Sequence, residues 1–275
     1  MAVDIYKYLR EDKLPHIWCP GCGHGTILNS LVRAIDQTDI DPDKTVVVSG
    51  IGCSGRAPGY LKFDTLHTTH GRAIAFATGI KLANPELNVI VLTGDGDGSA
   101  IGGNHLIHGC RRNIDLTVIL FNNQIYGMTG GQYSPMTPTG AVATTSPYGN
   151  IDQDFDLVDL TRSAGATFVA RGATYNPRQM TKLYKEGLEH KGFSFIETLD
   201  QCPVNYGRKN NIGGPTEMLD WQKEHTVPAS KWEKMPEEEK EGIFPLGVIH
   251  RKDDPESEYT ARYQQIIDSF AKEDE

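Results

Sequence analysis

The feature of the sequence that most constrains the fold is a series of short apolar runs, separated by stretches with helical spacing. Residues 88–93 (NVIVLT) and 116–121 (LTVILF) consist almost wholly of branched and aromatic apolar residues. A strand with one face in solvent alternates apolar and polar side chains, whereas a strand covered on both faces is apolar throughout. The sequence therefore predicts an α/β fold, a parallel sheet with helices on both faces.

The predicted elements alternate along most of the chain. Strands are expected at 45–48, 88–93, 116–121, 167–170 and 193–199, and helices at 24–37, 71–84, 101–112, 156–166 and 177–190. Beyond residue 202 the pattern gives way to an extended tail rich in Pro, Gly, Lys and Glu, with a short helix expected at 256–272. We therefore expect one α/β domain over residues 1–205 and a C-terminal extension over residues 206–275 that packs on a partner subunit.

Composition and charge narrow the class of protein. The net charge of −9 argues against a general electrostatic grip on nucleic acid. No apolar run is long enough to cross a membrane and the first residues show no apolar secretory core, so a cytoplasmic location is expected. Five cysteines in a chain of this kind do not indicate a disulfide framework, so metal or redox chemistry is the expectation to test.

The strongest chemical signal is a Gly-Asp-Gly turn at residues 94–96, followed at the end of the next strand by Asn122-Asn123. Glycines let the backbone approach phosphate oxygens closely, and carboxylate and amide oxygens suit Mg²⁺. Because the carboxyl ends of parallel strands meet at one edge of the sheet, Asp95 and Asn123 are expected to hold one Mg²⁺ ion. Asp97 is a rival ligand, but the spacing favours Asp95. Ordinary surface turns are the alternative, and the order strand, turn, helix, strand, Asn pair argues against them.

Four cysteines lie in predicted loops. Cys19 and Cys22 form a glycine-rich Cys-x-x-Cys knuckle, Cys53 lies in GCSG, and Cys202 precedes a proline. Four thiolates suit either a 4Fe–4S cluster or structural zinc, and a redox dithiol is a third reading of the knuckle. The spacing alone does not separate these, but an electron acceptor beside a cofactor site has a chemical purpose, which favours iron and sulfur. Cys110 lies in a predicted helix and is expected to be a small, partly buried residue.

Together, the segments CPGCGHG, GIGCSG, HTTHGRA, GDGDGSAIGGNHLIH and NNQIYGMTGGQ resemble the β subunits of 2-oxoacid:ferredoxin oxidoreductases. The resemblance covers roughly residues 15–205 in order and is closest to the branch that uses 2-oxoglutarate. It implies the diphosphate-binding half of the thiamine diphosphate fold, with thiamine diphosphate, Mg²⁺ and one 4Fe–4S cluster as cofactors. The implied reaction converts 2-oxoglutarate and coenzyme A to succinyl-CoA and CO₂, or runs in reverse, with electrons passing through the cluster to ferredoxin.

The resemblance also implies roles for individual residues. The cluster ligands are Cys19, Cys22, Cys53 and Cys202. The Mg²⁺ ligands are Asp95, Asn123 and the backbone carbonyl of Ile125. The residues that line thiamine diphosphate are Ile51, Gly52, Cys53, Ser54, His70, Gly96, Asp97, Gly127 and Met128. His70 could instead cap the helix that follows it, but a phosphate contact is favoured because His readily donates to an anion at a helix start.

Substrate choice is expected to depend on Arg56 and Met128. A guanidinium three residues after Cys53 could hold the second carboxylate of 2-oxoglutarate bidentately. Met128 stands where pyruvate-specific relatives tend to carry Asn. A solvated loop charge is the alternative for Arg56, and pyruvate, branched-chain or aryl 2-oxoacids are the alternative substrates.

The resemblance further implies a partner chain. Thiamine enzymes bind the aminopyrimidine on a second α/β domain, which supplies an activating carboxylate, and one such domain fills most of this sequence. We therefore expect that Glu on an α subunit, in an αβ pair or its dimer, and assign no catalytic residue to this chain. A self-sufficient homodimer and a non-catalytic zinc-stabilised scaffold are the alternatives.

Overall fold

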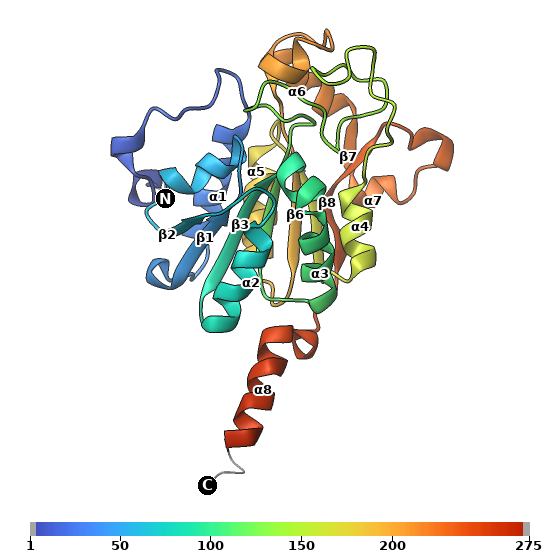
Figure 1. Cartoon of the computed structure of the whole chain (residues 1–275). Helices are drawn as coiled ribbons and strands as arrows, with labels where there is room; N and C mark the ends of the chain where they lie inside the picture. The colour runs from blue at the N-terminus through green and yellow to red at the C-terminus, as the bar shows by residue number, and fades with distance from the viewer. Residues whose placement is uncertain (1–3, 272–275) are drawn as a thin grey trace.

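The computed structural model describes residues 4–271, and its centre is a sheet of eight strands (Figure 1). The spatial order of the strands is β2-β1-β3-β4-β6-β5-β8-β7. Neighbouring strands run parallel except β5 and β8, which pair antiparallel. The parallel sheet predicted from the continuous apolar runs is therefore confirmed.

The elements follow the predicted alternation closely through residue 199. The strands are β1 (Thr45–Ser49), β2 (Asp64–His67), β3 (Asn88–Gly94), β4 (Thr117–Asn122), β5 (Phe168–Ala173), β6 (Ser194–Leu199), β7 (Thr226–Pro228) and β8 (Phe244–Arg251). The helices are α1 (His24–Asp36), α2 (Ala73–Ala83), α3 (Gly103–Arg112), α4 (Leu157–Ala164), α5 (Pro177–Glu189), α6 (Pro215–Glu224), α7 (Ala229–Trp232) and α8 (Tyr259–Ala271). Only β2 among the first six strands was not predicted, because its sequence, DTLH, is neither apolar nor alternating.

Helices cover both faces of the sheet, and alternate residues of the central strands serve opposite faces. On one face α1 and α5 pack over Val47, Ile90 and Ile119. On the other face α2, α3 and α4 pack over Val48 and Val91. Because both faces are buried, the carboxyl-end edge of the sheet is where a ligand can reach the strands.

The C-terminal region contains structure that the sequence pattern did not reveal. The strand β8 pairs with β5 across a register shift between Val169 and Ala170, so residues 244–251 extend the central sheet. An extended tail is therefore the wrong description for this stretch. The packing of residues 206–275 on a partner subunit stays a prediction.

The last described element, α8, extends away from the sheet (Figure 1). It confirms the helix expected near 256–272, although residue 272 lies outside the described part. Its side chains Tyr263, Ile266 and Phe270 are 47%, 55% and 64% exposed. Within residues 4–271, no helix combines the length and the apolar character needed to cross a bilayer.

Candidate active site

A cavity of about 480 Å³ lies at the carboxyl ends of β1, β3 and β4. Its volume falls in the range of small-molecule sites. It is lined by every residue that the sequence predicted to contact thiamine diphosphate or Mg²⁺: Ile51, Gly52, Cys53, Ser54, His70, Asp95, Gly96, Asp97, Asn123, Ile125, Gly127 and Met128. The structure therefore brings the predicted motifs together, while the role of each residue stays a prediction.

The carboxylate of Asp97, only 3% exposed, joins the loops around this cavity. Its Oδ1 accepts hydrogen bonds from the backbone N–H groups of Ile51 (3.1 Å) and Gly71 (2.7 Å) and lies 2.7 Å from Nδ1 of His70. Its Oδ2 accepts a hydrogen bond from the Thr93 hydroxyl at 2.7 Å. Both oxygens of this side chain thus hold the surrounding loops in position.

The two predicted side-chain ligands of Mg²⁺ are both buried in the cavity wall, Asp95 at 3% and Asn123 at 7% exposure. The Ser134 hydroxyl donates to Oδ2 of Asp95 at 2.6 Å, and burial raises the pKa of this carboxyl to about 7. Oδ1 of Asn123 accepts the N–H of Ile125 at 3.3 Å, which fixes the turn after β4. A buried carboxyl whose charged form lacks solvation is stabilised as an anion by a cation. The oxygen donors present therefore fit Mg²⁺.

The Cys-x-x-Cys knuckle is fixed to the loop that follows β6. The N–H of Cys22 donates to the carbonyl of Cys19 at 3.1 Å, which closes the turn. The side-chain amide of Gln201 donates to the carbonyl of Gly21 at 3.1 Å, which holds the knuckle beside Cys202. Segments 180 residues apart in the chain are thus brought together, as the prediction of one four-cysteine site requires.

The sulfurs of Cys53 and Cys202 converge over Gly127, where an added Cβ would lie 3.7 Å and 3.6 Å from them. Burial raises the pKa of Cys22, of Cys53 (to about 11) and of Cys202, and the charges of neighbouring thiolates act in the same direction. Cys19 acts in this way on both Cys53 and Cys202. Cys22, Cys53 and Cys202 are partly buried and Cys19 is exposed. Thiolates that repel one another in this way need positive metal charge, so this donor set fits a 4Fe–4S cluster and, by its sulfur atoms alone, zinc.

The remaining cysteine, Cys110, is fully buried in α3 and packs in the core on the other face of the sheet. It is free, like the other four. Its place in the core agrees with the structural role that the sequence predicted.

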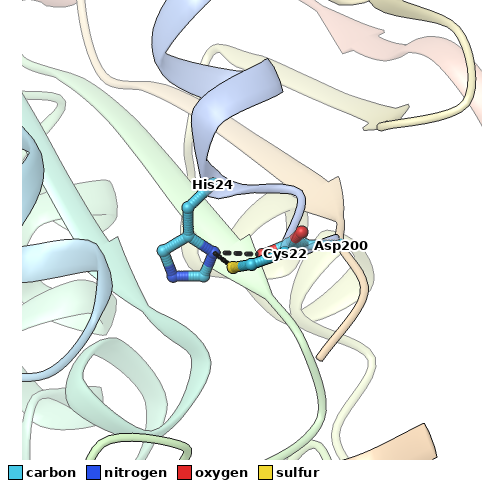
Figure 2. Close-up of side chains that lie close together, drawn as sticks. All are labelled: Cys22, His24 and Asp200. Atoms are coloured by element: carbon cyan, nitrogen blue, oxygen red, sulfur yellow. Dashed lines mark hydrogen bonds and ion pairs between the residues drawn. The ribbon is translucent and has the colours of Figure 1, made fainter. Parts of the chain in front are cut away.

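A histidine that the sequence did not single out, His24, lines the cavity. Figure 2 shows it beside Asp200 and Cys22, a cysteine of the knuckle. Nδ1 of His24 lies 2.5 Å from Oδ2 of Asp200 and 3.3 Å from Sγ of Cys22. The His24 ring packs edge-on against Phe121, with 5.0 Å between ring centroids, and the side chains of His24 and Asp200 are 1% and 0% exposed. The His24–Asp200 contact is short but poorly directed, because neither carboxylate oxygen has a hydrogen bond of good geometry among the described residues.

The two predicted substrate residues lie in different surroundings. Met128 lines the cavity and is 41% exposed. Arg56 lies on the turn Ser54–Tyr60, is exposed, and is not among the residues that line the cavity. Contact between Arg56 and a substrate carboxylate stays a prediction.

Several further residues line the cavity that the sequence reasoning did not assign. They are His24, Gly94, Phe121, Tyr126, Thr129 and Gln132. The Tyr126 hydroxyl donates to the carbonyl of Gly96 at 2.9 Å, and its ring leaves no room for a Cβ at Gly96. Three of these residues lie within the segment NNQIYGMTGGQ, so their position directly after the predicted Mg²⁺ ligand was the available signal.

The central part of the chain, residues 50–198, matches the family model described as thiamine pyrophosphate enzyme, C-terminal TPP binding domain. This range contains the Gly-Asp-Gly turn, the Asn pair and the loop of Cys53. The match therefore covers every residue that lines the cavity except His24.

The chain is also similar to curated proteins over nearly its whole length. It is 54% identical to the 2-oxoglutarate synthase subunit KorB of Methanothermobacter marburgensis, over 95% of this chain and 91% of that protein. It is 52% identical to the protein of the same name from Methanocaldococcus jannaschii, over 97% of this chain and 98% of that one. A β subunit of a 2-oxoacid:ferredoxin oxidoreductase from Saccharolobus solfataricus is 47% identical over 68% of this chain and 62% of its own length.

Among solved structures, the fold resembles a 2-oxoglutarate:ferredoxin oxidoreductase from Magnetococcus marinus with a TM-score of 0.86. The two chains are 33% identical, and the likeness covers 98% of this chain and 91% of that one. That structure is described with 2-oxoglutarate, coenzyme A and succinyl-CoA bound.

Proposed function

The chain belongs to the thiamine-diphosphate-dependent 2-oxoacid:ferredoxin oxidoreductases, and from this premise we propose that it is the β subunit of an enzyme acting on 2-oxoglutarate. The reaction is the oxidative decarboxylation of 2-oxoglutarate with coenzyme A to succinyl-CoA and CO₂, or its reverse, with ferredoxin as the electron partner. The observation that carries the proposal is a single cavity in which the Gly-Asp-Gly turn, the Asn pair and Cys53 meet.

The cavity supports thiamine diphosphate held through Mg²⁺. Asp95, Asn123 and the carbonyl of Ile125 would hold the ion, which would supply positive charge next to the diphosphate. Asp97 keeps the loops of Ile51 and His70 in place around it. When bound, thiamine supplies an electron sink for decarboxylation.

Cys19, Cys22, Cys53 and Cys202 would hold a 4Fe–4S cluster, which accepts and donates electrons one at a time. Cys53 is both a wall of the cavity and one of the two sulfurs above Gly127. This shared position supports an electron acceptor directly beside the thiamine site. A structural zinc ion at the same cysteines would have no such use, so iron and sulfur are favoured.

The composition of the cavity wall supports a partner α subunit. Among the described residues, its only carboxylates are Asp95 and Asp97. The first is assigned to Mg²⁺, and the second accepts hydrogen bonds on both oxygens. The carboxylate that activates the aminopyrimidine must therefore come from elsewhere, and we assign it to the α subunit.

The substrate assignment is tested with the complete αβ enzyme by comparing kcat/KM for ferredoxin reduction with 2-oxoglutarate and with pyruvate. We expect activity that requires coenzyme A and favours 2-oxoglutarate by at least tenfold. Replacing Arg56 with Ile should reduce this preference by raising KM for 2-oxoglutarate. A wild-type enzyme that prefers pyruvate or a branched-chain 2-oxoacid would overturn the substrate and retain the family.

A further inference from the structure

The ring of His24 packs against Trp18 and Phe121, but this packing does not explain the buried carboxylate of Asp200 beside it. Neither His24 nor Asp200 caps a helix through its side chain, and both are almost completely excluded from solvent. A buried carboxylate normally receives well-directed hydrogen bonds, yet among residues 4–271 both oxygens of Asp200 lack them. Gly23 lies so close to Asp200 that a Cβ there would overlap Oδ1 of the carboxylate. The chain is therefore built to bring this carboxylate against the cysteine knuckle.

The pair lies beside the predicted sulfur ligands, and His24 also lines the cofactor cavity. Figure 2 shows the Nδ1 edge of His24 turned toward Cys22 and Asp200, which lie far apart in the sequence. Asp200 precedes Cys202 by two positions, and its charge raises the pKa of Cys22, Cys53 and Cys202. Its negative charge is thus felt at three of the four sulfurs.

Elementary electrostatics gives the two side chains opposite effects on a cluster held by those sulfurs. Reduction adds one electron to a group that four thiolates already make negative, and no bond is made or broken. A carboxylate nearby opposes the added charge, whereas an N–H directed at a ligand sulfur stabilises it. Nδ1 of His24 is the one side-chain nitrogen within 3.3 Å of the Cys22 sulfur among the hydrogen bonds of the described residues.

We propose that His24 and Asp200 are a positioning pair that sets the reduction potential of the cluster, with Asp200 lowering it and the N–H of His24 raising it. The proposal rests on the proposed function, because it requires a cluster at Cys19, Cys22, Cys53 and Cys202. It goes beyond that function by assigning the tuning of the electron step to two residues that are not ligands. The short His24–Asp200 contact keeps both side chains in place beside the sulfur of Cys22.

The experiment measures the midpoint potential of the cluster in the complete αβ enzyme by dithionite titration monitored by EPR. Asp200→Asn removes the carboxylate and keeps its shape, and His24→Leu removes the N–H. His24→Asn is the rescue variant, because its amide N–H can occupy the position of Nδ1. Asp159→Asn, at an exposed carboxylate on α4, is the matched control for loss of one negative charge.

We expect Asp200→Asn to raise the potential and His24→Leu to lower it, each by at least tenfold in the one-electron equilibrium constant, which is about 59 mV. His24→Asn and Asp159→Asn should stay close to the wild type. Shifts of Asp200→Asn and His24→Leu in the same direction, or no shift in either with iron content intact, would overturn the proposal. Should His24→Leu lose its cluster, His24→Phe, which keeps an aromatic ring and lacks the N–H, decides by the same criterion. Should Asp200→Asn lose its cluster, Asp200→Ser takes its place.

The wild-type enzyme separates this inference from the proposed function. Iron and acid-labile sulfide in the purified wild type establish the cluster independently of any variant. Zinc in place of iron, held by Cys22, His24 and Asp200 or by the four cysteines, would overturn the proposed function and the inference together. A cluster whose reduction potential does not change when either side chain is replaced would overturn the inference alone.

Discussion

Replacing Asp97 with Ala should both destabilise the protein and weaken thiamine diphosphate binding. The substitution leaves two buried donors, the N–H of Gly71 and the hydroxyl of Thr93, without this acceptor, and it also removes the acceptor of the partly buried N–H of Ile51. Each unsatisfied buried donor costs about 1–3 kcal/mol, so the free energy of unfolding should fall by about 2–6 kcal/mol. His70 is 39% exposed on its side chain and can turn to water, so it adds little.

The isosteric variant Asp97→Asn separates the hydrogen bonds from the charge. Its carbonyl oxygen can keep the three contacts of Oδ1, and its NH₂ can donate to the Thr93 hydroxyl. We therefore expect a loss smaller than that of Asp97→Ala by at least 1 kcal/mol. Chemical denaturation gives the stability of each αβ variant, and calorimetry gives the affinity for thiamine diphosphate with Mg²⁺. Asp97→Ala with wild-type stability and affinity would refute the positioning role.

Three further perturbations test the fold and the cluster site. Gly127→Ala places a methyl group between two cysteine sulfurs, so the iron content should fall with little change in stability. The control is Gly79→Ala in α2, which has open space around it. This variant should keep its iron, and its free energy of unfolding should rise by about 0.5–1 kcal/mol. Arg171→Leu leaves the buried carboxylate of Glu197 without the guanidinium that lies 2.6 Å from it. Chemical denaturation should show a free energy of unfolding lower by about 3–5 kcal/mol. A decrease of less than about 1 kcal/mol would contradict this. Burial lowers the pKa of His190 below 6.5, so below pH 6.5 the unfolded chain binds more protons than the folded one and stability should fall as the pH drops. His190→Gln should make the thermal midpoint depend less on pH in this range. An unchanged pH dependence in the variant would contradict the assignment to His190.

The central sheet was predictable because the local sequence of most of its strands shows a clear strand pattern. The runs at β3 and β4 are apolar throughout, and the strong turn and helix signals between them set the alternation. The strand β8 was not predictable in the same way, since Pro245, Gly247 and His250 interrupt its pattern. Its strand conformation comes from pairing with β5, a contact between segments far apart in the chain that no local pattern shows.

The candidate site likewise has one part that the sequence predicts and one part that it does not. Asp95 and Asn123 follow strand ends, so their convergence follows from the topology of a parallel sheet. Two other contacts depend on the exact course of loops in three dimensions. Asp97 accepts hydrogen bonds from the N–H groups of Ile51 and Gly71. His24 contacts Asp200. Such contacts carry no signature in the residue types alone, and only coordinates reveal them.

The central claim is that this β subunit passes electrons from 2-oxoglutarate to a 4Fe–4S cluster. The most direct test is the absorbance spectrum of the anaerobically purified αβ enzyme, loaded with thiamine diphosphate and Mg²⁺, before and after addition of 2-oxoglutarate and coenzyme A. We expect a brown protein whose visible absorbance bleaches with 2-oxoglutarate and stays unchanged with pyruvate. A colourless, zinc-containing protein, or a brown one that 2-oxoglutarate does not bleach, would contradict it.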